Sequence, residues 1–161
     1  VDVEEFLTEA AAGLALLREG REAEAGSVLE SAEARYTGDF LEEDAYEEWA
    51  TALREEARTT YIAVARALAR LAVGFGNPEA SSGLHLRILE RDPYDEEAHL
   101  GLVAVLLAVG RHGEARRFYR TYVARMEELD VEPAPMPAPA EIASSTGDPA
   151  FALANLARTG S

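Results

Sequence analysis

The residue types that most often carry catalysis or metal binding are few and scattered in this 161-residue chain. Its three histidines, His85, His99 and His112, do not stand at metal-ligand spacing from one another, and Cys is absent. The segment Gly74-Phe75-Gly76 lacks both the length and the Lys of a phosphate-binding loop. No serine or threonine lies in a nucleophile-elbow context. We therefore expect no catalytic residue, no metal site and no cofactor.

An acid-rich stretch lies between Asp39 and Glu48. The spacing of its carboxylates does not match a calcium-binding loop. Negative charge is favourable where a helix begins, because the positive end of the helix dipole lies there. We interpret the stretch as a solvated acidic loop that leads into a helix, and not as a cation site.

A group of arginines is the surface candidate of most interest. A helix would place Arg116, Arg117 and Arg120 close together on one side. In a chain with 30 acidic and 15 basic residues they form a local positive patch, which could contact an acidic protein or a DNA backbone. The alternative is internal pairing, either with the preceding hairpin or with the carboxylates of Glu114, Glu127 and Glu128. Of the two, we expect internal pairing.

The net charge of -15 limits the partners of the chain. A protein this acidic is repelled by nucleic acid and by anionic membranes, so we expect no direct nucleic-acid binding and no membrane contact. The longest apolar run, from Leu100 to Val109, is half a membrane span and predicts a buried helix. The lack of Cys fits a reducing compartment, and we expect a cytoplasmic location. Because the chain starts at Val1 without Met, we also expect a fragment of a longer protein.

Six segments carry apolar residues at three- and four-residue steps, which predicts helices over about 2–19, 22–35, 46–73, 78–91, 96–109 and 113–129. A Gly, an Arg and then Glu-Ala follow an apolar helix end at Gly20 and again at Gly110, and a looser copy lies at 73–80. This repetition is typical of a helical hairpin array. No segment has a strand pattern. We predict an all-α fold, an α–α superhelix of about three antiparallel helical hairpins.

The C-terminal part of the chain differs in composition from the helical part. Pro alternates with Ala or Met from Pro133 to Pro139, which is typical of an extended linker. Asp148-Pro149 could begin a short last helix. We expect a helical domain over residues 1–132 and a Pro/Ala-rich tail over 133–161.

Residues 92–126 resemble a tetratricopeptide repeat. Asp92-Pro93 falls at the boundary of that repeat, and its packing positions hold Ala98, Leu102, Gly110, Ala115 and Tyr119. Small residues there let paired helices approach each other, and larger side chains fill the space between them. His99 occupies a large packing position, so we expect its ring in the core.

A second resemblance covers about residues 2–133. The segment Tyr36-Thr37-Gly38-Asp39-Phe40 with Trp49, Arg54 and Tyr61 after it, together with 86–99, is similar to the signature of the bacterial transcriptional activator domain. Two departures stand out. Ala57 replaces the usual Leu, and the family usually continues as another helix after Glu132-Pro133.

The resemblance implies a structural role for most signature residues: Tyr36, Gly38, Asp39, Phe40, Trp49, Arg54, Tyr61, Pro93, Ala98, Gly110 and Ala115. We expect Trp49 and Tyr61 in the core. For Arg54 we expect either a carboxylate partner or a contact that caps the loop over 36–40.

The resemblance also implies a function. In Streptomyces antibiotic regulatory proteins this domain follows a winged-helix DNA-binding domain. The implied role is protein contact within a transcription regulator, and the implied partners are that DNA-binding domain, RNA polymerase, a sigma factor or a second copy of the chain. The alternative is a scaffold domain of a large multidomain or cell-wall-associated protein with no transcriptional role.

The groove face predicted for the array offers Leu100, Gly101, Ala104 and Ala108, and the chain has no Lys. A tetratricopeptide clamp for C-terminal carboxylates needs Lys and Asn at such positions, so we expect no carboxylate clamp. An apolar groove fits a helix, the tail of the chain itself or a neighbouring chain. The sequence leaves these three occupants open.

Overall fold

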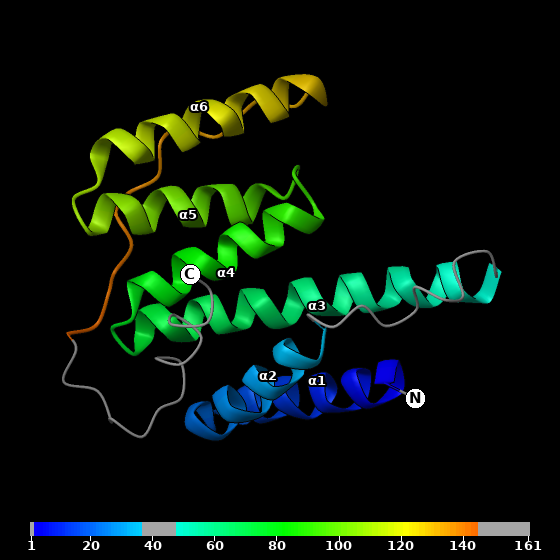
Figure 1. Cartoon of the computed structure of the whole chain (residues 1–161). Helices are drawn as coiled ribbons and strands as arrows, with labels where there is room; N and C mark the ends of the chain where they lie inside the picture. The colour runs from blue at the N-terminus through cyan, green and yellow to red at the C-terminus, as the bar shows by residue number, and fades with distance from the viewer. Residues whose placement is uncertain (1, 37–47, 145–161) are drawn as a thin grey trace.

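The computed structural model describes residues 2–36 and 48–144, and within these ranges the chain forms helices and no strands. The helices are α1 (Asp2–Arg18), α2 (Glu22–Tyr36), α3 (Glu48–Gly74), α4 (Pro78–Arg91), α5 (Glu96–Ala108) and α6 (His112–Glu128). They form three consecutive antiparallel hairpins stacked in chain order (Figure 1). The predicted all-α hairpin array is confirmed. The beginning of the third helix as predicted, at Tyr46, and the short helix predicted near Asp148 lie outside the described residues.

The Gly-Arg pattern seen in the sequence is a repeated helix cap. At the end of α1, Gly20 has φ 79°, its amide donates to Leu17 O at 3.0 Å, and the amide of Arg21 donates to Leu16 O at 3.0 Å. Gly110 repeats this geometry after α5 with φ 83°. A left-handed residue with these two hydrogen bonds is a Schellman cap, which satisfies the last helix carbonyls and turns the chain.

The arginine of the same pattern forms an ion pair in both copies. The guanidinium of Arg21 contacts both carboxylate oxygens of Glu24, and that of Arg111 contacts both oxygens of Glu114 at 2.9 and 2.7 Å. Each pair spans the first turn of the second helix of its hairpin. Pairs as exposed as these contribute little to stability, because solvent screens them. The main effect of the repeated Gly-Arg pattern is therefore the helix cap and turn, and the ion pair adds little.

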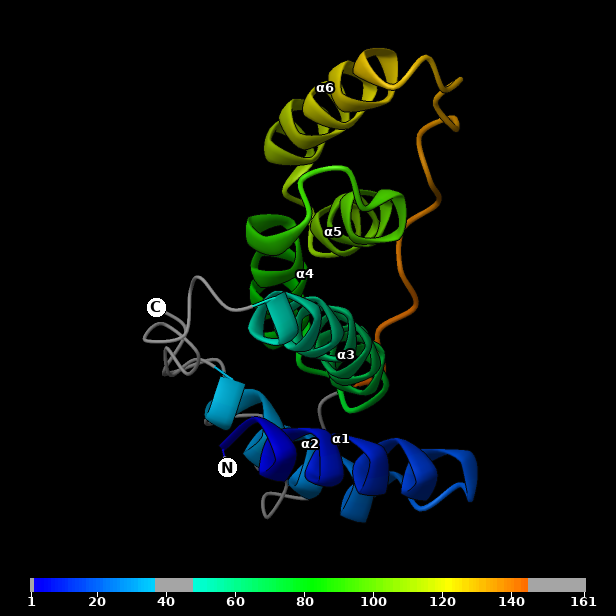
Figure 2. The same ribbon diagram turned by 90° about the vertical axis from the view of Figure 1, so that its right-hand side faces the viewer.

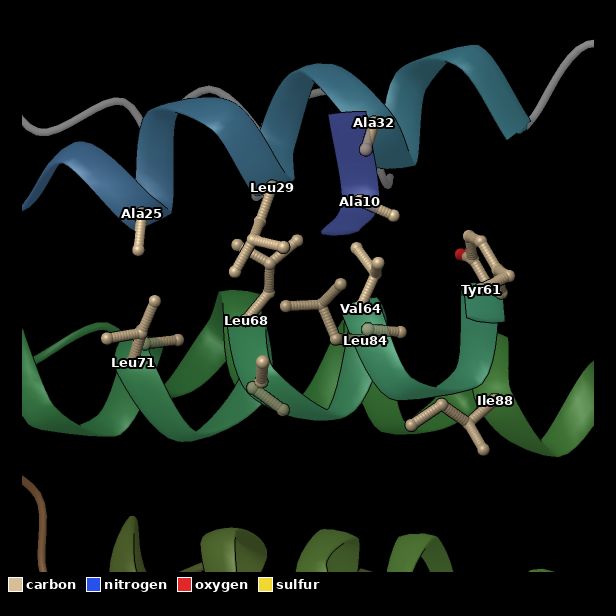
Figure 3. Packing of buried hydrophobic residues seen from close by; sticks show 14 of the residues in the cluster. Ala10, Ala25, Leu29, Ala32, Tyr61, Val64, Leu68, Leu71, Leu84 and Ile88 are labelled. Carbon is tan, nitrogen blue, oxygen red and sulfur yellow. The ribbon is translucent and has the colours of Figure 1, made fainter. Parts of the chain in front are cut away.

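Most of the core lies between the first two hairpins. Leu29 of α2, Val64 and Leu68 of α3, and Leu84 of α4 are fully or almost fully buried (Figure 3). Phe6 of α1 belongs to the same cluster and is fully buried. A smaller cluster, made of Leu102, Val103, Leu106 and Ala115, joins α5 to α6. Leu89 of α4 packs against both clusters. As the apolar run predicted, α5 lies inside the array, between α4 and α6 (Figure 1).

Residues 131–144 pack against the helical array. The chain leaves α6 through Asp130, a non-glycine residue with φ 55°, and the amide of Val131 bonds to Met126 O at 2.9 Å. This is the same cap as at Gly20, made here by an Asp, a residue that tolerates the left-handed region. The segment then turns back and follows the side of α5 that faces away from α4, down to the end of α3 (Figure 2). The predicted linker is extended, but it is docked.

Candidate interaction surfaces

The arginine patch on α6 is exposed and unpaired. Arg116, Arg117 and Arg120 are all exposed on this helix. Among the residues that the structure describes, their guanidinium groups make no ion pair and no hydrogen bond. The expected internal pairing is therefore wrong. The patch presents three full charges to solvent.

Two of the three carboxylates expected as partners are engaged elsewhere. Glu114 pairs with Arg111 at 2.7 Å, and Glu128 pairs with Arg125 at 3.0 Å. Glu128 also accepts a hydrogen bond from the hydroxyl of Tyr94 at 2.7 Å. Arg117 also lies three positions from Glu114, so helix spacing allows either pair. In the structure Glu114 pairs with Arg111, which leaves Arg117 without this carboxylate.

The second surface is the groove that residues 131–144 occupy. The hydroxyl of Tyr119 donates to Ala134 O at 2.7 Å, and the amide of Ala134 donates to the hydroxyl of Tyr122 at 2.8 Å. Further along, the amide of Ala140 donates to Ala104 O at 2.9 Å. Ala104 was one of the predicted groove residues. Of the three occupants left open by the sequence, the structure shows the chain's own tail.

Tyr122 links this groove to the core of the last hairpin. Its hydroxyl donates to Glu96 at 2.5 Å, and its ring lies 5.7 Å from those of His99 and Tyr119. Burial raises the pKa of Tyr122 above its ordinary value, and the hydrogen bond to Glu96 adds to this. His99 is buried and its Nε2 lies 2.6 Å from Pro93 O, so the expected core role of His99 is confirmed.

An ion pair fixes the start of α5 to α3. Two guanidinium nitrogens of Arg66 contact the carboxylate of Asp95 at 3.0 and 2.7 Å, and Asp95 also accepts the amide of Ala98 at 2.9 Å. Burial by itself would raise the pKa of Asp95, but the hydrogen bonds from Arg66 and Ala98 lower it below its ordinary value. The side chain of Asp95 therefore both caps α5 and links the third hairpin to the second.

The signature residues Tyr36 and Tyr61 meet in the core. Their rings stack with centroids 4.2 Å apart, and the guanidinium of Arg91 lies 4.6 Å from the Tyr61 ring. The hydroxyl of Tyr61 donates to Glu33 at 2.7 Å, and Glu33 pairs with Arg87 at 3.3 Å. Burial raises the pKa of Tyr61, and the charge of Glu33 raises it further. The expected core position of Tyr61 is confirmed.

Sequence reasoning missed Glu33. It is a buried carboxylate on α2, and it completes a cluster with Tyr36, Tyr61, Arg87 and Arg91 that joins α2, α3 and α4. Its position next to the apolar Ala32 was the only signal available in the sequence. We interpret the cluster as structural, because its charged groups and rings contact one another.

The remaining signature residues divide into three groups. Ala98 and Ala115 are fully buried between helices, Gly110 makes the cap after α5, and Pro93 is exposed in the turn before α5. Arg54 is half-buried on α3, and its partner stays a prediction. Gly38, Asp39, Phe40 and the side chain of Trp49 lie outside the described residues, as does most of the acid-rich stretch.

A surface hollow of about 370 Å³ lies between α1 and α3. It is lined by apolar and arginine side chains: Leu14, Leu17, Arg18, Ala63, Arg66, Ala67 and Arg70. Within 2–36 and 48–144, no group of three or more His, Asp or Glu side chains could hold a metal ion. None of the helices described is both long and apolar enough to cross a bilayer.

Three stacked hairpins with Ala and Gly at the helix contacts define a helical array of the tetratricopeptide type. The family model of the bacterial transcriptional activator domain matches residues 1–137, and the chain belongs to this family. The resemblance found in the sequence is thereby confirmed. It is a family of regulatory domains associated with transcription activation, and not a family of enzymes. Comparisons with curated proteins and with solved structures gave no match.

Proposed function

We propose that this chain is the protein-contact domain of a bacterial transcription regulator and that it acts by binding, without catalysis. Family membership supports the regulatory role. The observation that carries the contact role is the patch of Arg116, Arg117 and Arg120, which stays unpaired in a chain of net charge -15. Exposed charges without internal partners need break no ion pair before they bind, and they steer association with an acidic surface.

The proposed partner is an acidic protein surface: the DNA-binding domain of the same regulator, RNA polymerase or a sigma factor. The patch has only three arginines on an acidic chain, and a duplex contact would need several more phosphate-binding cations to be stable. We therefore propose no direct nucleic-acid binding by this chain. A cytoplasmic location goes with a role in transcription. We keep residue 132 as the boundary between the helical array and its tail.

Binding of purified RNA polymerase, its sigma factor and the DNA-binding domain to the whole chain tests the proposal. The test variant carries Arg116→Glu, Arg117→Glu and Arg120→Glu. The control variant carries Arg18→Glu, Arg21→Glu and Arg70→Glu, three exposed arginines outside α6 that give the same change in net charge.

Loss of binding in the test variant but not in the control would place the contact on the patch. The difference in affinity between the wild type and the test variant should then become smaller at high salt, because salt screens exposed charges. Equal weakening in both variants would mean that net charge alone acts. If the folded wild-type chain binds none of the three proteins, the scaffold role becomes the better explanation.

A further inference from the structure

The docked segment has a three-residue period. Ala134, Pro137 and Ala140 are half-buried against the helices, as are Pro133 and Ile142 at the two ends. The exposed residues between Ala134 and Ala140 are Pro135, Met136, Ala138 and Pro139. A polyproline II helix has three residues per turn, so it presents every third side chain to the same surface. The burial pattern follows that period from Ala134 to Ala140, whereas the side chain of Ala143, the next position of the series, is exposed.

Backbone hydrogen bonds follow the same period. Ala134, Ala140 and Ala143 lie on it, and each of their amides donates to the helical array: to the hydroxyl of Tyr122, to Ala104 O and, at 3.0 Å, to Val73 O. Pro137, the remaining position of the series, has no amide hydrogen to donate. Each amide hydrogen at an on-period position therefore has a hydrogen-bond acceptor on the helical array.

Two tyrosines hold one end of the segment. The carbonyl of Ala134 accepts from Tyr119 and its amide donates to Tyr122, so both backbone polar groups of this residue are bound by phenol hydroxyls. Docking of an extended proline-rich peptide on an aromatic-lined groove is a known mode of recognition, and it works because the peptide has little conformational entropy left to lose.

The segment lies on the surface of the array and is not part of its buried core. None of residues 131–144 belongs to the buried hydrophobic clusters, which consist of residues from α1 to α6. Release of the segment would therefore leave the helical core closed. It would expose Tyr119 and the α5 face around Ala104.

We propose that the groove formed by Tyr119, Tyr122, α5 and the end of α3 is a recognition site for extended proline-rich peptides with a small residue at every third position. Residues 131–144 are its intramolecular occupant, and they mask it. The site lies apart from the function proposed above, and neither depends on the other.

The test uses a fluorescent peptide with the sequence of residues 131–144 and three forms of the whole chain. Ala134→Pro with Ala140→Pro removes two of the amide donors but retains the extended conformation, so it releases the segment. Ala138→Pro is the matched control, because Ala138 is exposed and off the period. We expect the released variant to bind the peptide about tenfold or more tightly than the wild type or the control, since a tethered segment competes at millimolar effective concentration.

Two controls check specificity: a peptide with the same residues in scrambled order, and the released variant with Tyr119→Phe added. We expect each to weaken binding severalfold. A released variant with unchanged helical content that does not bind the peptide overturns the proposal. A concentration-dependent dimer of the wild type that Ala134→Pro with Ala140→Pro abolishes would overturn the intramolecular assignment, because a second copy would then supply the segment.

Hydrogen exchange on the unmodified chain tests the masking without any variant. The amides of Ala140 and Ala143 should exchange about tenfold or more slowly than that of Ala138. Equal and fast exchange at all three amides would overturn the proposal.

Discussion

The hydroxyl of Tyr61 donates a 2.7 Å hydrogen bond to Glu33 at a place in the core where both side chains are buried. The two residues come from α3 and α2, and Glu33 also pairs with Arg87 of α4 at 3.3 Å. A buried carboxylate is tolerated only when its charge and its lone pairs are satisfied. This single contact therefore ties the first hairpin to the second.

Tyr61→Phe is expected to lower the free energy of unfolding by about 1–3 kcal/mol, because it leaves a buried carboxylate oxygen without its donor. Urea unfolding measures the change. Tyr94→Phe is the matched control: it removes a hydrogen bond of the same 2.7 Å length to Glu128, at an exposed site. The control should change stability much less, because solvent can replace the lost hydrogen bond at an exposed site. Equal effects would show that burial of Glu33 does not matter.

Glu30 should make stability depend on pH. Burial, and secondly the charge of Glu33, raise the pKa of Glu30 from 4.5 to about 7. The folded state then holds the proton more tightly than the unfolded state, so this contribution is present below pH 4.5 and is lost as pH rises through 7. Between these values, wild-type stability should fall relative to that of Glu30→Gln. Parallel stability curves for the two proteins contradict the prediction.

His85 should act in the opposite direction. Burial, and secondly the charge of Arg66, lower the pKa of His85 from 6.5 to about 4. The unfolded state then binds the proton more tightly, so the contribution is present above pH 6.5 and is lost as pH falls toward 4. Titration of the ring resonances by NMR gives the midpoint directly. A midpoint near 6.5 in the folded chain would refute the prediction.

Gly101→Ala is expected to destabilise the chain by about 1–3 kcal/mol, since a methyl group there overpacks the contact between α5 and α4. An added Cβ would lie 2.5 Å from Cε1 of His85. Gly83→Ala is the control, because nothing lies within 4 Å of its Cβ position in α4. Better helix propensity should stabilise that variant by about 0.5–1 kcal/mol. Thermal unfolding of both variants should show shifts of opposite sign.

Asp95→Ala should cost more than Asn77→Ala. Both residues cap a helix by accepting an amide hydrogen, from Ala98 and Ala80 respectively. Loss of a cap alone costs about 1 kcal/mol. Asp95 also binds Arg66 at 2.7 Å, so we expect about 2–3 kcal/mol for its removal. Chemical unfolding compares the two variants, and an equal cost would mean that the ion pair contributes nothing.

Much of the fold could be predicted from the sequence, because helices and turns depend on residues that are close together along the chain. Helices follow from apolar spacing within a few turns, and the turn at Gly20 follows from a backbone conformation that favours glycine. The caps at Asn77 and Asp95 are local in the same way, since an N-cap involves residues only three positions apart.

The contacts between distant residues were decided by the tertiary structure. Glu33 finds Tyr61 and Arg87 only because three helices meet there, and the patch around Arg117 is unpaired because α6 directs its carboxylates to other arginines. The docked tail depends on Tyr119 and on a groove that exists only when α5 and α6 are packed together. Sequence patterns report neighbours along the chain, whereas these partners are neighbours only in space.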